Sequence, residues 1–183
     1  MQLPLTLLIT SGNDRFEPIQ QLRYEVLRQP LGGSYESAKF HGDDFASTVH
    51  FRFVAESTEF SRSDLASPNS GDHFQNAEQH PAVACATLME SDPPAQIRAL
   101  IGSGNDFRQL RGMAVSEVLR GSGIGSKLLL EIHHYADISQ PKELLWCNAR
   151  EGAVPFYEKM GWRTAGEMFE IKGVGAHIAM CRF

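Results

Sequence analysis

The sequence lacks the features that mark several large classes of protein. Its 183 residues include only three cysteines, which are too scattered for a disulfide framework and form no CxxC pair. No apolar run approaches the roughly 18 residues that a membrane span needs. The N-terminus has no basic segment followed by a cleavage site of small residues, so we expect no signal peptide. We therefore predict a cytoplasmic protein that has no membrane partner.

Positive charge and metal-binding patterns are also scarce. The chain has 17 Lys and Arg against 22 Asp and Glu, a formal net charge of -5, and it has no basic stripe. This composition argues against nucleic acid as the main partner. The seven histidines show no HExxH or similar ligand spacing, and the adjacent His133 and His134 would point about 100° apart on a helix. We predict no metal site.

The length and the apolar patterns indicate one mixed α/β domain over residues 1–183. Apolar or alternating segments predict strands over 3–10, 49–55, 82–89, 107–115, 144–148, 162–172 and 177–183, with a short candidate strand over 97–101. Helical spacing predicts helices up to residue 28, with Asn13 or Asp14 as the cap, and over 124–137 and 152–160. A strand, helix and strand in succession imply a parallel pair, whereas the earlier strands form a meander. The polar segment at about 56–80 is predicted to be an exposed, mobile loop.

A glycine-rich turn, where a predicted strand leads into a predicted helix, is the most informative segment. It comprises Arg120, Gly121, Ser122, Gly123, Ile124, Gly125 and Ser126. Glycine lets a ligand approach the backbone, and the unpaired N–H groups and dipole of a helix N-terminus favour a phosphate. The P-loop template fails because Ser126, not glycine, precedes Lys127, and the dinucleotide template fails because GxGxG lies deep in the chain.

Three stretches resemble the GNAT N-acetyltransferase superfamily. Arg-x-x-Gly-x-Gly, at Arg120, Gly123 and Gly125, is similar to the coenzyme A pyrophosphate signature of that family. The run from Asn148 to Trp162 resembles its Ala-x-x-Phe/Leu-Tyr-x-x-x-Gly-Phe helix, with matches at Ala153, Phe156, Tyr157, Gly161 and Trp162. Residues 22–32 resemble the first helix of a bacterial subgroup whose acceptor is unassigned.

The resemblance implies a GNAT fold, in which a mixed twisted sheet has two parallel strands splayed apart near Met113 and Trp146. It implies acetyl-CoA as the acyl donor, no metal, and a primary amine on a small molecule or peptide as the acceptor; a homodimer stays open. The cofactor-binding residues that it implies are Met113, Ala114, Val115, Arg120, Gly121, Ser122, Gly123, Ile124, Gly125, Ser126, Asn148, Arg150 and Phe156. Arg150 stands where many family members have Asn, and Asn148 lies two residues earlier on the same strand face, so either could contact the pantetheine.

Tyr157 matches the family tyrosine that protonates the leaving thiolate, and a phenol with a pKa of about 10 suits that task. Candidate acceptor-binding residues are Arg23, Arg28, His50, Glu170 and His177. A general base could be Glu90, Glu117 or His50, and the sequence does not choose among them. One alternative is a regulatory module that binds acyl-CoA without turnover. Another, a nucleotide-dependent phosphotransferase, is weakened by the missing P-loop lysine.

Overall fold

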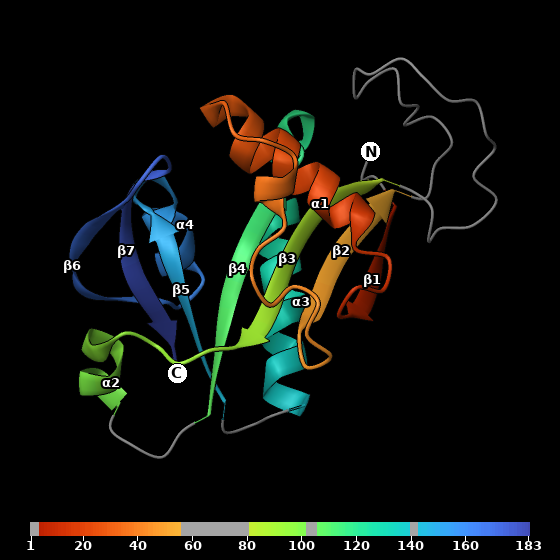
Figure 1. The fold of residues 1–183 in the computed structure, drawn as a ribbon. Helices are drawn as coiled ribbons and strands as arrows, with labels where there is room; N and C mark the ends of the chain where they lie inside the picture. Colours follow the sequence, from red (N-terminus) through yellow and green to blue (C-terminus); the bar gives the residue numbers. More distant parts are fainter. Residues whose placement is uncertain (1–3, 56–80, 102–105, 140–142) are drawn as a thin grey trace, which may run out of the picture.

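The strands join into one mixed sheet in the computed structural model, which describes residues 4–55, 81–101, 106–139 and 143–183 (Figure 1). The order across the sheet is β1-β2-β3-β4-β5-β7-β6. The strands are β1 Leu5–Ser11, β2 Val49–Ala55, β3 Ala82–Glu90, β4 Phe107–Val115, β5 Leu144–Arg150, β6 Arg163–Ile171 and β7 Gly175–Arg182. Among these described strands, β4 and β5 are the one parallel pair, so the predicted mixed sheet is confirmed. The loop predicted at about 56–80 lies outside the described residues.

Four α-helices accompany the strands in the described part of the chain: α1 Glu17–Arg23, α2 Ala95–Ile101, α3 Ile124–Ser139 and α4 Val154–Lys159. A π-helical turn, Tyr24–Arg28, continues α1, and short 3-10 turns cover Gln29–Leu31, Glu36–Ala38, Glu117–Leu119 and Glu151–Ala153. Among the described helices, none is long and apolar enough to cross a membrane.

Two local predictions were wrong. The candidate strand over 97–101 is helix α2, because Ile97 and Ile101 lie one helical turn apart and together pack against the sheet. The first helix begins at Glu17 after Phe16, without a side-chain cap, so neither Asn13 nor Asp14 caps it. Burial of its apolar face therefore outweighs the local capping preference that the sequence pattern suggested.

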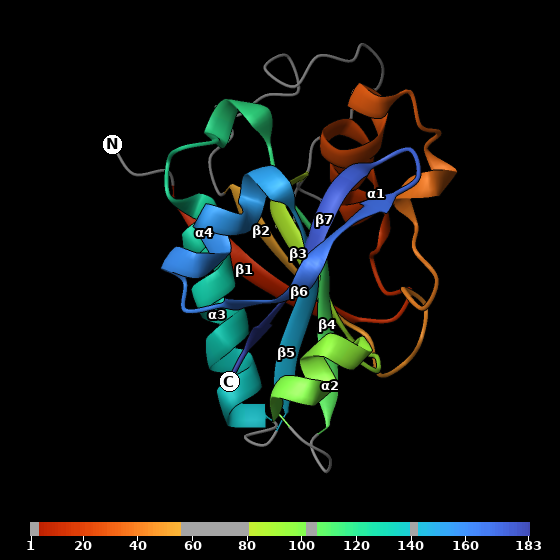
Figure 2. The ribbon, with the colours of Figure 1, turned by 90° about the vertical axis from the view of Figure 1, so that its left-hand side faces the viewer.

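Helices cover both faces of the sheet. Figure 2 shows α3 and α4 on one face and α1 and α2 on the other. The larger core lies under α3, whose buried Leu128, Leu129 and Ile132 pack against residues of β2, β3 and β5. On the opposite face Ile19 and Leu22 of α1 pack against β3 and β4.

The parallel strands β4 and β5 separate soon after they meet. They pair only at Phe107–Leu144, Arg108–Leu145 and Gln109–Trp146, after which β4 follows β3 and β5 follows β7. The β3–β4 register shifts where β4 has one extra residue at Gly112, which has a φ of +59°. A side chain there would collide with the Arg23 guanidinium, so the bulge requires glycine. The predicted splay is confirmed, and it leaves the β5-facing edge of β4 open beyond Gln109.

Candidate functional site

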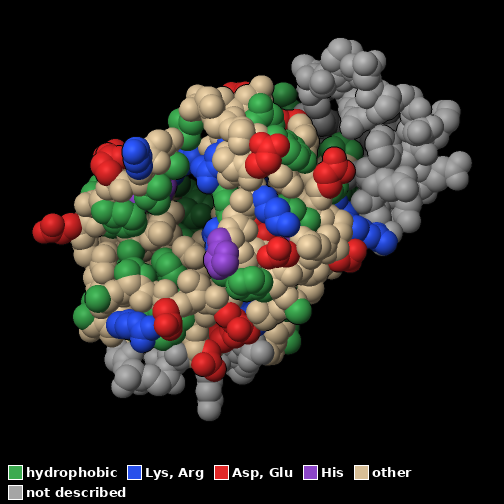
Figure 3. Space-filling model, viewed as in Figure 1, with side chains coloured by type: hydrophobic (Ala, Val, Ile, Leu, Met, Phe, Trp, Pro, Cys, Tyr) green, Lys and Arg blue, Asp and Glu red, His purple; other side chains and the backbone are tan. Residues whose placement is uncertain are grey.

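A cleft of about 1170 Å³ occupies the space between the separating strands. Figure 3 shows the hollow between the β5–β7 part of the molecule and the part under α1, with Lys or Arg side chains at its rim. The predicted residues that line it are Met113, Ala114, Val115, Arg120, Gly121, Gly123, Gly125, Ser126, Asn148, Arg150, Phe156, Tyr157, Arg28 and His177. The fold thus brings most of the predicted site into one cavity.

Two predicted cofactor residues are not part of the cleft lining. The side chain of Ile124 is buried in the core beneath α3. The Ser122 hydroxyl donates a hydrogen bond of 2.6 Å to the carbonyl oxygen of Leu119 and so shapes the turn. These two residues can therefore contact a ligand in the cleft only through their backbone groups.

The glycine-rich turn forms an open cradle at the start of α3. Gly121 and Gly123 have φ values of +77° and +86°, which glycine adopts without strain, and open space surrounds the position of an added Cβ at each. The first helical hydrogen bond of α3 runs from the Lys127 N–H to Gly123 O, at 3.0 Å. The N–H groups just before it belong to the unpaired first turn of the helix and favour an anion. Arg120 adds an exposed positive charge beside this turn, 3.8 Å from Glu117.

Tyr157 lies on α4 with its hydroxyl directed at β4. The hydroxyl is 3.6 Å from Met113 Sδ, and the ring packs against Trp162 with 5.3 Å between centroids. Burial raises the pKa of the Tyr157 phenol well above its usual value of 10, and the neighbouring Cys147 raises it further. The group is therefore a protonated donor throughout the physiological pH range.

Asn148 and Arg150 both reach the cleft from β5, because they alternate with residues that face the α3 core. Arg150 Nη2 donates a hydrogen bond of 3.2 Å to Leu27 O, at the end of the first helical segment. Arg150 is also opposite His177 in the β5–β7 register. The structure therefore places both candidate pantetheine contacts on the face of the sheet that α1 covers.

Arg23 and His50 lie in the core under α1, outside the cleft lining. Arg23 Nη1 is 2.8 Å from Asp43 Oδ2, and both side chains are 0% exposed. Thr87 Oγ1 accepts a hydrogen bond from Arg23 and is 2.7 Å from His50 Nδ1. Burial lowers the pKa of His50, so its ring stays neutral. This network ties α1 to β3 and explains both residues structurally, which removes them from contact with an acceptor in the cleft.

The predicted carboxylates also lie elsewhere. Glu170 is an exposed residue of β6, Glu90 is 3.9 Å from Arg108, and Glu117 pairs with Arg120. None of them lines the cleft. The structure therefore provides no support for Glu170 as an acceptor contact or for Glu90 and Glu117 as bases.

The sequence reasoning missed Phe40, Arg111 and Lys159, which also line the cleft. Three guanidinium groups surround the Phe40 ring: Arg23 at 4.5 Å and Arg28 and Arg111 at 4.9 Å from its centroid. Arg111 gives only a weak signal, since it is a charged residue inside a predicted strand that also contains Arg108 and Gln109. Phe40 carries none, because it lies in a segment without periodicity.

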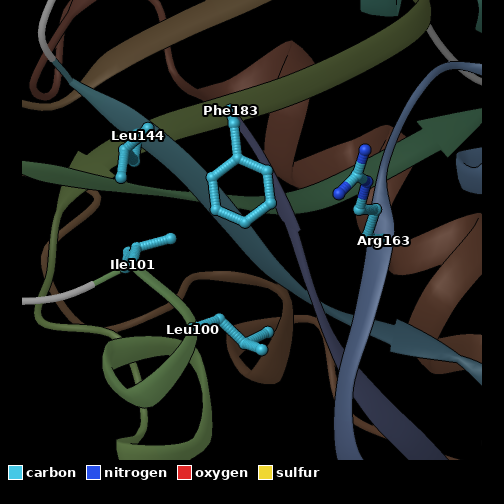
Figure 4. A pocket seen from close by; sticks show the side chains of 5 residues that line it. All are labelled: Leu100, Ile101, Leu144, Arg163 and Phe183. Atoms are coloured by element: carbon cyan, nitrogen blue, oxygen red, sulfur yellow. The ribbon is translucent and has the colours of Figure 1, made fainter.

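A second depression of about 470 Å³ lies at the other end of the sheet. Leu100, Ile101, Leu144, Arg163 and Phe183 line it (Figure 4). The Arg163 guanidinium is 5.8 Å from the Phe183 ring centroid. It contains none of the predicted site residues and no group suited to proton transfer.

Comparison with known proteins agrees with this geometry. Residues 72–180 match the sequence model of a family described as "Acetyltransferase (GNAT) domain". The uncharacterized N-acetyltransferase YitI of Bacillus subtilis is 39% identical over 85 residues, which are 46% of this chain and 56% of YitI, so the match spans little more than half of that relative.

Solved structures extend the likeness to nearly the whole chain. Escherichia coli ElaA matches with a TM-score of 0.68 at 19% identity, covering 98% of this chain and 100% of ElaA. Arabidopsis thaliana NAA60, solved in complex with acetyl-CoA, matches with a TM-score of 0.64 at 15% identity, covering 97% and 98%. At these identities the structural matches establish the fold.

Proposed function

Because the chain belongs to the GNAT acetyltransferase family, we propose that it transfers the acetyl group of acetyl-CoA to a primary amine. One observation carries this proposal: a single cleft joins the glycine cradle, the open edge of β4 and the Tyr157 hydroxyl. Each of these features suits a different part of an acyl-CoA thioester. The complex of NAA60 with acetyl-CoA supports the same donor on this fold.

We expect the pyrophosphate, the pantetheine and the thioester of the donor to bind different parts of the cleft. The pyrophosphate would bind the amides of residues 121–126 with the Arg120 charge beside it. The pantetheine, an extended chain of amides, would pair with the open edge of Met113–Val115 as an added strand does. The thioester would then lie close to Tyr157, whose hydroxyl is next to Met113.

The reaction is direct attack of the neutral amine on the thioester carbonyl. A backbone N–H near Val115 would stabilise the oxyanion, and Tyr157 would give its proton to the leaving thiolate. Its raised pKa makes the phenol a weaker acid, but burial in the same place also raises the pKa of the leaving thiol. Because both pKa values rise, proton transfer from the phenol to the thiolate remains favourable.

His177 is suited to accept the proton that the amine loses. Its Nδ1 is 2.7 Å from Gly175 O, and a carbonyl oxygen can only accept, so Nδ1 carries the ring proton. Nε2 of a neutral ring then has a free lone pair. Among the described residues of the cleft lining there is no Asp or Glu, and His177 is the one histidine. We assign it the role of general base.

Calorimetric titration against acetyl-CoA, ATP and NAD, followed by thiol-release assays with a panel of primary amines, tests the proposal. We expect acetyl-CoA to bind, ATP and NAD to bind weakly or not at all, and at least one amine to release CoA with formation of an amide. Binding of acetyl-CoA without turnover of any amine would instead indicate the regulatory module. Binding of ATP in preference to acetyl-CoA would refute the proposed donor.

A further inference from the structure

The charge of the cleft is opposite to the charge of the whole protein. The chain carries a net charge of -5, yet the described residues that line the cleft include five Arg or Lys and no Asp or Glu. Arg120 and Lys159 belong to the α3 and α4 side, where the donor phosphates would bind. The other three, Arg28, Arg111 and Arg150, lie on the α1 side, where the proposed donor has no negative group.

Backbone contacts hold these three arginines in place. Arg28 Nε donates to Ser37 O at 2.9 Å, Arg111 Nη1 donates to His41 O at 2.9 Å, and Arg150 Nη2 donates to Leu27 O at 3.2 Å. The Phe40 ring supports Arg28 and Arg111 from one side. Each guanidinium has five N–H donors, so each keeps several for a ligand.

No carboxylate of the described residues forms an ion pair with any of the three. Asp43, whose charge acts on Arg111, is already paired with Arg23. Burial lowers the pKa of Arg28, and the positive charges of Arg150 and Arg23 lower it further. Half-buried like charges without a counterion are costly, and an anion between them would relieve that cost.

We propose that the acceptor of this enzyme is a primary amine that also carries a carboxylate, and that Arg28, Arg111 and Arg150 bind that carboxylate. The inference rests on the function proposed above and adds the class of the acceptor. Val26, Leu27, Ile171 and Val174 complete this side of the cleft with apolar surface, which favours an amino acid with an apolar side chain. Placed in this way, the acceptor would lie beside His177, the cross-strand neighbour of Arg150.

The first test compares acceptors that differ only in the carboxylate. Leucine, methionine and phenylalanine are assayed beside their amides, with acetyl-CoA at saturation. We expect kcat/KM to be about 10–100-fold higher for the free acids, the range for losing charge-assisted hydrogen bonds. The preference would oppose intrinsic reactivity, because the amine of an amino-acid amide has the lower pKa and is more often neutral. Equal turnover of acids and amides would overturn this inference and leave the proposed function intact.

The second test does not depend on turnover. With CoA present, wild type is titrated with N-acetyl-leucine and with its amide, and the titration is repeated for Arg28→Gln and for the control Arg163→Gln, which is outside the cleft. We expect Arg28→Gln to weaken binding of the carboxylate by about 10–100-fold, to leave the amide and CoA unchanged, and Arg163→Gln to change nothing. Loss of CoA affinity in Arg28→Gln would assign the arginine to the donor and overturn the inference. Absence of turnover with every amine, acids and amides alike, would overturn the proposed function itself.

Discussion

Replacing Tyr157 by Phe removes one oxygen from the cleft and leaves the ring in place. Among the described residues, the hydroxyl contacts only a weak acceptor, Met113 Sδ at 3.6 Å, while the ring packs against Phe156 and Trp162. The loss of such a weak hydrogen bond should change the free energy of unfolding by no more than about 1 kcal/mol. Affinity for acetyl-CoA should also stay the same, because the proposed cradle lies at the start of α3.

The rate of acetyl transfer should respond very differently. Losing a positioned proton donor lowers rates by roughly 10²–10³-fold, which corresponds to about 2.7–4 kcal/mol of transition-state stabilisation. The proton is needed only as the thiolate leaves, so kcat should fall while the KM for acetyl-CoA stays constant. Initial rates of thiol release, measured over a range of donor concentrations with an established amine acceptor, separate the two constants.

The pH profile provides a second readout. Burial raises the pKa of Tyr157 above its usual value, so the wild-type profile should show no loss of activity from phenol ionisation up to about pH 10. The Phe variant should have a profile of the same shape and lower height. Full activity of Tyr157→Phe would refute the assignment of the acid, and a raised KM with normal kcat would show that the hydroxyl binds the donor instead.

The remaining predictions concern the cradle, the buried histidine on α3 and the ion pair beneath the first helix. Gly123→Ala and Gly161→Ala both place a side chain at a φ near +85° in open space, so each variant should lose about 1–2 kcal/mol of stability. Only Gly123→Ala should weaken CoA binding in a titration. Equal CoA affinities of the two variants would exclude the cradle. Burial lowers the pKa of His133 from 6.5 to about 4, so the unfolded chain takes up its proton first as pH falls, and stability should drop between pH 6.5 and 4. Urea unfolding at pH 7.5 and 5 measures how much unfolding free energy each protein loses on acidification, and His133→Gln should lose about 2 kcal/mol less than wild type. An equal loss in both proteins would contradict the burial argument. Asp43→Asn should lower the free energy of unfolding by about 3–5 kcal/mol, because it leaves the buried Arg23 charge without a partner, and a change below 1 kcal/mol in urea unfolding would argue against the pair.

The local pattern of this chain was sufficient for most elements and for the glycine-rich turn that precedes α3. Strand β2 was predicted with its observed limits, since the residues from Val49 to Ala55 alternate as they do in a strand. The GNAT resemblance of the glycine-rich turn and of the Tyr157 helix correctly indicated the family and the splayed strand pair. Helix α2 was missed because the apolar residues of the seven-residue segment after two prolines, among which Gln96 and Arg98 lie, fit the spacing of a strand as well as that of a helix.

Residue types in the sequence determined which groups this protein has for phosphate binding and proton transfer, and local spacing determined the elements that carry them. Only the tertiary structure decided where the arginines and histidines lie, because that depends on which faces of α1, β4 and β5 meet. Arg23 and Arg28 are five residues apart in one helical segment, yet Arg23 is buried against Asp43 and Arg28 lines the cleft. A helix turns through about 100° per residue, so a short separation in sequence leads to opposite surroundings, and packing alone determines which side chain meets the core and which meets a ligand.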